Sequence, residues 1–82
     1  RHKVSGWILI SVQANKEEYA IEKMIGTPEI TRLHTTNGKW DLAAEIQVPT
    51  LEHFDAVVSK LRQIDGITET DTSLLLSSRI GE

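Results

Sequence analysis

The chain has 82 residues, of which 39% are hydrophobic, and a formal net charge of −3. This length and composition fit one small globular domain, and the negative charge argues against binding nucleic acid by bulk charge. The absence of cysteine excludes disulfides and thiolate chemistry, and without a long apolar run or a signal peptide we expect a cytoplasmic protein away from membranes.

The first part of the chain predicts a strand followed by a helix. Residues 7–14 are rich in β-formers, and their poor alternation suggests a central strand. Asn15 is expected to be the helix N-cap, and Gly26 with Pro28 is expected to end the helix. Four apolar residues fall on one face of this helix: Ala20, Ile21, Met24 and Ile25.

The middle of the chain predicts a β-hairpin. Residues 30–36 and 40–48 have strand patterns, and Asn37-Gly38 lies between them. Asn-Gly favours a type I′ turn, because both residues tolerate a positive φ. The second strand has the cleanest period of two, with one face formed by Trp40, Leu42, Ala44, Ile46 and Val48.

A second helix and a last strand complete the pattern. Thr50 is the expected N-cap after Pro49, and Gly66 is expected to end the helix. The helix carries an apolar stripe of Leu51, Phe54, Val57, Val58, Leu61 and Ile64. Residues 67–80 predict a long strand, with Thr68, Thr70 and Thr72 on one face.

The order βαββαβ predicts an α+β, ferredoxin-like fold for residues 1–82 as a single domain. Its four-stranded antiparallel sheet would carry both helices on one face. The strands contain too many apolar residues for the other face to remain in water. We therefore expect a second copy of the chain to cover that face.

The hairpin also carries the best candidates for chemistry. Asp41 could hold an ammonium group or order nearby amides, or it could be a solvated carboxylate at a hairpin end. Thr70 and Thr72 could line a cleft, or they could reflect strand propensity alone. Gly38 is explained by turn geometry in either case, and Trp40 fits a core or subunit contact.

The remaining side chains make a weak case for catalysis. His2, His34 and His53 lack metal-ligand spacing, and no catalytic triad, P-loop or dinucleotide motif is present. We therefore predict no catalytic residue, metal or cofactor. One alternative is a small dimeric α/β-barrel oxygenase or isomerase without cofactor, in which His34 and Trp40 would line the pocket. The charges of the first helix, including Lys23, predict a solvated face.

Two segments resemble a known family. The hairpin, His-Thr-Thr-Asn-Gly-Lys-Trp-Asp-Leu-Ala-Ala-Glu-Ile over residues 34–46, resembles the Thr-Gly-x-Tyr-Asp-Leu segment of Lrp/AsnC transcriptional regulators. Residues 66–76, which contain Thr70 and Thr72, resemble the Pro-Gly-Val-x-x-Thr-x-Thr-x-x-Val-Leu ending of the same family. The similarity extends over about residues 7–80, in the same order of elements.

The resemblance implies the effector-binding (RAM) domain of that family. Such a domain dimerises, often assembles further into octamers, and binds a small effector, usually an amino acid, in clefts between dimers. Gly38 and Asp41 match the turn that contacts the effector, and Thr70 and Thr72 match hydroxyls of the last strand. Four flanking residues are weaker candidates: Thr36, Asn37, Lys39 and Trp40.

The chain departs from the family pattern at several positions. Asn37 replaces a usual Thr, Trp40 a common Tyr, and Asp65 a frequent Pro. The usual helix-turn-helix DNA-binding domain has no counterpart here, and the chain begins with Arg1. We therefore expect a stand-alone or excised effector domain, without direct nucleic-acid binding, whose partners include full-length Lrp/AsnC regulators.

Overall fold

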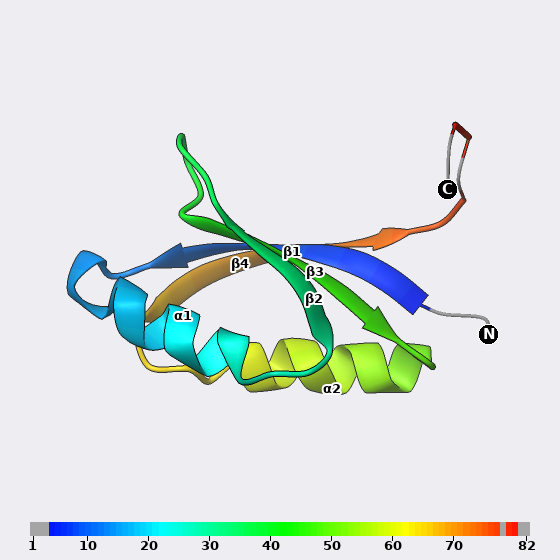
Figure 1. The fold of residues 1–82 in the computed structure, drawn as a ribbon, viewed down its shortest axis with the longest axis horizontal. Helices are drawn as coiled ribbons and strands as arrows, with labels where there is room; N and C mark the ends of the chain where they lie inside the picture. The colour runs from blue at the N-terminus through cyan, green and yellow to red at the C-terminus, as the bar shows by residue number, and fades with distance from the viewer. Residues whose placement is uncertain (1–3, 78, 81–82) are drawn as a thin grey trace.

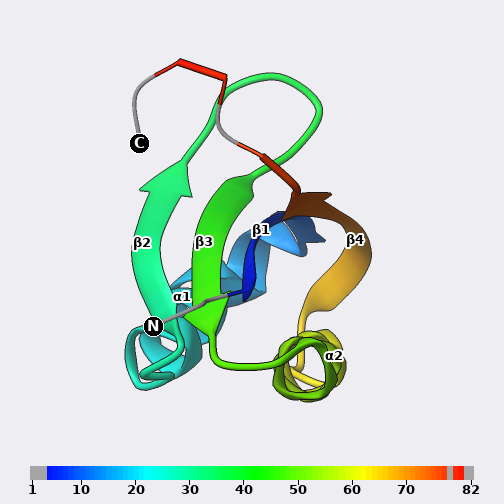
Figure 2. The same cartoon turned by 90° about the vertical axis from the view of Figure 1, so that its right-hand side faces the viewer.

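The computed structural model describes residues 4–77 and 79–80. The elements are β1 (Val4–Val12), the 3-10 helix η1 (Ala14–Lys16), α1 (Glu17–Ile25), β2 (Ile30–Thr35), β3 (Leu42–Val48), α2 (Leu51–Arg62) and β4 (Ile67–Leu75). All strand pairs are antiparallel, and the strand order is β2-β3-β1-β4, with β1 and β3 in the centre (Figure 2). The predicted ferredoxin-like α+β fold is confirmed.

The hydrophobic core lies between the sheet and the two helices, which cover the same sheet face (Figure 1). Alternate residues of the central strands point toward the helices, because side chains alternate between the faces of a sheet. The fully buried strand residues include Ile8, Ile10, Leu42, Ala44, Ile46 and Val48. The helices contribute Met24, Phe54, Val57, Val58 and Leu61. The apolar face predicted for the third strand is therefore the face of β3 that meets the helices.

Gly6 allows a close approach between α2 and the sheet. A Cβ atom added at Gly6 would lie 2.5 Å from Cζ of Phe54 and 2.7 Å from the carbonyl oxygen of Ser73. Phe54 is 2% exposed, so its ring is enclosed. The absence of a side chain at Gly6 lets this ring pack directly on β1.

Several boundaries differ from those predicted. The N-cap role of Asn15 is wrong, because Asn15 lies inside η1 and α1 follows Lys16 without a side-chain cap. β1 ends at Val12 and begins at Val4, earlier than predicted. β4 ends at Leu75, which pairs with Ser5, and does not continue to Ile80. Residue 78 of that predicted strand lies outside the described residues.

Two apolar residues predicted on buried helical stripes are exposed. Ile25 is 73% exposed and Leu51 is 52% exposed. Ile25 is the last residue of α1, and Leu51 is the first residue of α2. At a helix end, periodicity gives the direction of a side chain without placing a sheet residue opposite it.

The predicted cap at Thr50 is confirmed, as is the stop at Gly26. The Thr50 hydroxyl accepts a hydrogen bond from the backbone N–H of His53 at 3.0 Å. Gly26 follows α1 and donates to the carbonyl of Glu22 at 3.3 Å. The buried Thr27 side chain then donates to the carbonyl of Lys23 at 3.0 Å, which satisfies an acceptor of the last turn.

A side-chain hydrogen bond ties α2 to the residue before β2 and predicts a loss of stability in acid. His53 Nε2 lies 3.0 Å from Glu29 Oε2. This hydrogen bond, and a second from the backbone N–H of Glu29, hold the pKa of the Glu29 carboxyl below its ordinary value, although partial burial opposes them. Because the native state favours the ionised carboxyl, its contribution is complete above the ordinary glutamate pKa of about 4.3. It disappears as the pH falls through the lowered native pKa.

Urea unfolding at about pH 5.5 and about pH 3 tests this contribution. We expect the wild-type chain to lose more free energy of unfolding between these values than Glu29→Gln, which has no carboxyl to protonate. Equal losses in the two proteins would show that the Glu29–His53 pair contributes nothing.

Candidate functional site

The β2–β3 loop, residues 36–41, is exposed at residues 36–39 and projects away from the helices (Figure 1). The predicted type I′ turn is wrong. Gly38 has a φ of +112°, but Asn37 does not share it, since no non-glycine residue in the described ranges has a positive φ. The Thr36 N–H donates to the Asp41 carbonyl at 3.0 Å, and the Thr36 hydroxyl donates to the Trp40 carbonyl. The predicted strand start at Trp40 therefore moves to Leu42.

The tip of the loop presents open backbone. An added Cβ at Gly38 would have no heavy atom within 4 Å. Across the described part of the chain, the backbone N–H groups of residues 37–39 donate no hydrogen bond. The Lys39 ammonium lies 5.0 Å from the centroid of the half-buried Trp40 ring, a cation–π distance. The loop thus offers unpaired donors next to a positive charge.

Asp41 joins the base of this loop to the end of β1. Its carboxylate oxygen Oδ2 accepts the backbone N–H of Val12 at 2.9 Å, and its own N–H donates to the Ile10 carbonyl at 2.8 Å. The second oxygen, Oδ1, has no hydrogen-bond partner in the residues that the structure covers. Asp41 therefore has a structural contact on one oxygen and an unused acceptor on the other.

Thr70 and Thr72 do not lie at the β2–β3 loop of the same chain. They pair with Ile10 and Ile8, whose side chains face the helices, so both threonines share the helix-facing side of the sheet. The Thr70 hydroxyl accepts a hydrogen bond from Arg62 Nε at 3.0 Å. The Thr72 hydroxyl is buried and has no partner in the described residues. The other predicted site residues, 36–41, do lie together.

The sheet face opposite the helices, here called the open face, carries an aromatic pair that sequence reasoning missed. Trp7 of β1 and His34 of β2 stack with centroids 6.2 Å apart and an interplanar angle of 28°. They meet across Ala43, which pairs with His34 and leaves room for the rings. His34 thus stacks on Trp7, whereas the oxygenase alternative paired it with Trp40. Only the pairing register, which is not visible in the sequence, brings Trp7 to His34.

Charges on the open face are divided between its two edges. Arg32 and His34 lie on β2, where Arg32 Nε is 3.5 Å from Glu45 Oε1. Glu69 and Asp71 lie on β4. They share this face, because they pair with Ser11 and Leu9, which alternate with the buried residues of β1. The half-buried apolar residues lie between a basic edge and an acidic edge.

Within the described ranges, no group of three His, Cys, Asp or Glu side chains could hold a metal ion. The same residues contain no helix long and apolar enough to cross a membrane.

The fold and the loop together define a ferredoxin-like domain with one uncovered sheet face and an exposed glycine turn. A family model described as the Lrp/AsnC ligand binding domain matches residues 6–81. The chain belongs to this family, so the resemblance seen in the hairpin and the last strand is confirmed.

Similar proteins agree with this assignment. The HTH-type transcriptional regulator FL11 of Pyrococcus furiosus is 27% identical over 75 residues, which are 92% of this chain and 50% of that protein. The chain thus spans about half the length of the relatives it matches. The crystal structure of FFRP-DM1 superposes with a TM-score of 0.85 at 28% identity, covering 89% of this chain and 99% of that one. AsnC of E. coli, at 23% identity, shows the same fold with a TM-score of 0.87 over 96% of this chain and 54% of its own.

Proposed function

We propose that this chain is a non-catalytic domain of an Lrp/AsnC-type transcriptional regulator that binds an amino-acid effector and forms oligomers in the cytoplasm. The observation that carries the proposal is the β2–β3 loop, which has unpaired backbone donors at its tip and the unused oxygen of Asp41 at its base. A free amino acid has one ammonium and one carboxylate, and this loop offers an acceptor and donors for the two groups.

In this proposal, the effector's ammonium group donates to Asp41 Oδ1, while Oδ2 keeps its bond to Val12. The effector's carboxylate accepts from the amides around Gly38, where the missing side chain leaves the backbone accessible. Charge-assisted hydrogen bonds of this kind are the stronger class. Thr36, Asn37, Lys39 and Trp40 shape the surroundings.

Thr70 and Thr72 have a different place in the proposal. Their hydroxyls face α2 in the same subunit, and Thr70 is already bonded to Arg62. We therefore propose that both threonines hold β4 against α2, and that the β2–β3 loop alone contacts the effector directly.

The oligomer in this proposal forms through the open face. Trp7 and Leu9 are half-buried there in the single chain, and a second sheet would remove them from water. A two-fold axis parallel to the strands would place the basic β2 edge of one copy over the acidic β4 edge of the other. Such an isologous contact uses the same patch on both subunits.

Effector binding would act on assembly. A ligand held between subunits favours the assembly state that completes its site, by as much as its affinity for the two states differs. In a full-length regulator, this shift would reposition the DNA-binding domains. A stand-alone domain would act by joining full-length partners, in dimers or in octamers.

A thermal-unfolding screen against the twenty amino acids tests the effector proposal. A ligand at about ten times its dissociation constant stabilises a protein by roughly 1.4 kcal/mol by mass action. For a domain of this size, we expect a rise in unfolding temperature of about 5–10 °C with one or a few amino acids. A flat response from folded protein across the panel would contradict it.

Leu9→Glu tests the oligomer proposal. The change places a charge in the middle of the open face, next to Asp71 on the neighbouring strand, where water still reaches it in a single chain. We expect sedimentation velocity to show a shift toward monomer, because a buried unpaired charge opposes association. Ser59→Glu, on the exposed side of α2, is the control. An unchanged distribution for Leu9→Glu would place the contact elsewhere.

A further inference from the structure

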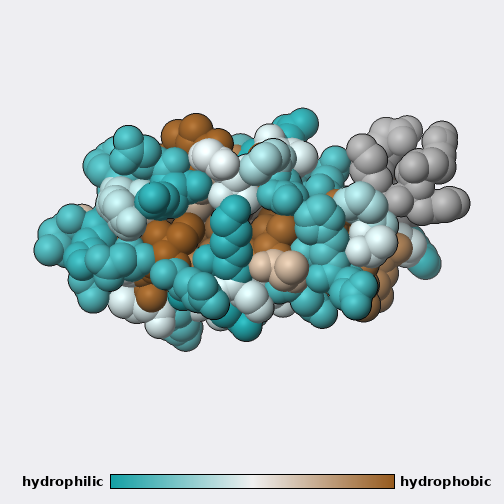
Figure 3. Space-filling model, turned by 90° about the horizontal axis from the view of Figure 1, so that it is seen from below, coloured by the Kyte–Doolittle hydropathy of each residue, from teal (hydrophilic) through white to brown (hydrophobic). Residues whose placement is uncertain are grey.

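The helix side of the molecule contains a groove that the proposed function does not use. It lies between α1 and α2 and has a volume of about 640 Å³, in the usual range of small-molecule sites. Figure 3 views this side and shows apolar surface between flanking hydrophilic side chains. The sheet separates the groove from the open face (Figure 1).

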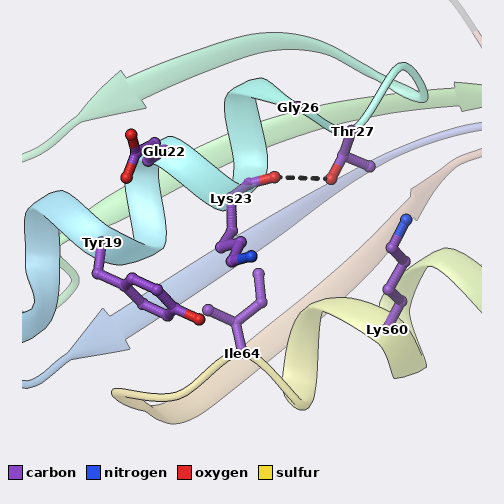
Figure 4. Close-up of a pocket in the computed structure, with 7 residues that line it drawn as sticks. All are labelled: Tyr19, Glu22, Lys23, Gly26, Thr27, Lys60 and Ile64. Carbon is purple, nitrogen blue, oxygen red and sulfur yellow. Dashed lines mark hydrogen bonds between the residues drawn. The ribbon is translucent and has the colours of Figure 1, made fainter.

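Two lysines from different helices lie at this groove. Lys23 comes from α1 and Lys60 from α2, and both extend into the space between the helices (Figure 4). Neither ammonium group forms an ion pair with a carboxylate in the residues the structure describes. Glu22 also lines the groove, but its carboxylate points away from both lysines in Figure 4. The groove is therefore locally basic in a chain whose net charge is −3.

The walls of the groove are partly apolar. The Lys23 ammonium lies 5.5 Å from the centroid of the Tyr19 ring, and this cation–π contact favours its position over the groove. The Tyr19 hydroxyl points toward Ile64, which lines the opposite wall (Figure 4). Thr27 anchors the end of α1 by donating to the Lys23 carbonyl. A hydroxyl donor and an apolar wall thus accompany the two charges.

We propose that this groove binds a small organic dianion, a phosphate monoester or a dicarboxylate, between the ammonium groups of Lys23 and Lys60. Two like charges that share a groove repel each other, and a dianion between them replaces that repulsion with two attractions. The Tyr19 hydroxyl donates to one of its oxygens, and the apolar part of the ligand lies against the Tyr19 ring and Ile64. The site is separate from the β2–β3 loop.

Calorimetric titration at low ionic strength tests the proposal with three probes: phenyl phosphate, inorganic phosphate and succinate. We expect saturable binding that weakens as salt is added. Phenyl phosphate should bind more tightly than inorganic phosphate, because only its ring can cover the apolar wall. Tighter binding of phenyl phosphate than of succinate would identify a phosphate monoester, and the reverse order would identify a dicarboxylate.

Single substitutions locate the site. We expect Lys23→Gln and Lys60→Gln each to weaken binding about tenfold, the loss of one charge-assisted hydrogen bond. Glu22→Gln removes the negative charge of a residue that lines the groove and should strengthen binding. Lys16→Gln is the control, because it removes an equal charge outside the groove, where Lys16 pairs with Asp65.

Three results would overturn the proposal. One is the absence of saturable binding for all three probes. Another is unchanged affinity in both Lys23→Gln and Lys60→Gln. The last is an equal loss in Lys16→Gln, which would show attraction by overall charge and no site.

Discussion

Replacing Gly6 by alanine is expected to lower the free energy of unfolding by about 2 kcal/mol or more, because it overpacks the contact between β1 and α2. The new Cβ would lie 2.5 Å from the Phe54 ring and 2.7 Å from the backbone oxygen of Ser73. The Ser73 oxygen belongs to the backbone of β4, which is paired with β1, and the Phe54 ring is enclosed in the core. In a domain of this size, such a loss is a large part of a total stability of roughly 4–12 kcal/mol.

Gly26→Ala is the matched control for this substitution. A Cβ at Gly26 would lie 3.6 Å from its nearest neighbour, the Lys23 carbonyl oxygen, and φ there is −79°. We expect no loss, or a gain of about 0.5 kcal/mol from the stiffer unfolded chain. Chemical denaturation measures both variants. Equal stability of Gly6→Ala and the wild type would show that the close packing of Phe54 on β1 is wrong.

The second large effect is expected at Asp41. Asp41→Ala removes the acceptor of the Val12 N–H and should lower the free energy of unfolding by about 1.5–3 kcal/mol, the range for hydrogen bonds to charged groups. Asp41→Asn keeps an oxygen that can accept this bond, so it should retain most of the stability. Denaturant unfolding of the two variants separates the structural contact from the charge.

The same pair of variants separates fold from ligand binding. If the carboxylate holds the effector's ammonium group, Asp41→Asn should lose most of its amino-acid affinity while it stays folded. Asp41→Ala should lose both affinity and stability. Full affinity in Asp41→Asn would remove Asp41 from the proposed site and leave it with the structural role alone.

The sequence carried enough information to predict the order of elements and the core-facing side of β3. Alternation from Leu42 to Val48 corresponds to buried side chains, because one sheet face meets the helices. Thr50 marks the start of α2 for a local reason, because its side chain accepts the backbone N–H of His53. α1 ends just before Gly26, two residues ahead of Pro28, which cannot continue a helix. These signals depend on residues close in sequence.

Features that depend on distant contacts were not predictable in the same way. Asn37-Gly38 favours a two-residue turn, but the bonds of Asp41 to Ile10 and Val12 of β1 accompany a longer loop. Thr70 and Thr72 are two positions apart, so the sequence places them on the same face of their strand. It does not show whether that face meets the helices. Only the pairing with β1 places them under α2.

The groove between the helices was also not predictable from the sequence. Periodicity places Lys23 on the solvent side of α1, which predicts an ordinary charged surface. The packing of α1 beside α2 then brings Lys60 to the same groove as Lys23, although the two residues are far apart in the sequence. No local pattern contains this relation, since it depends on where both helices lie on the sheet.

The most direct test of the central proposal is calorimetric titration of the wild-type chain with the amino acids, followed by Asp41→Asn and Lys60→Gln. We expect saturable heat from one or a few amino acids, lost in Asp41→Asn and retained in Lys60→Gln, because the β2–β3 loop and the helix groove are separate. No saturable heat from any amino acid, with the wild-type chain folded and oligomeric, would contradict amino-acid sensing by this domain.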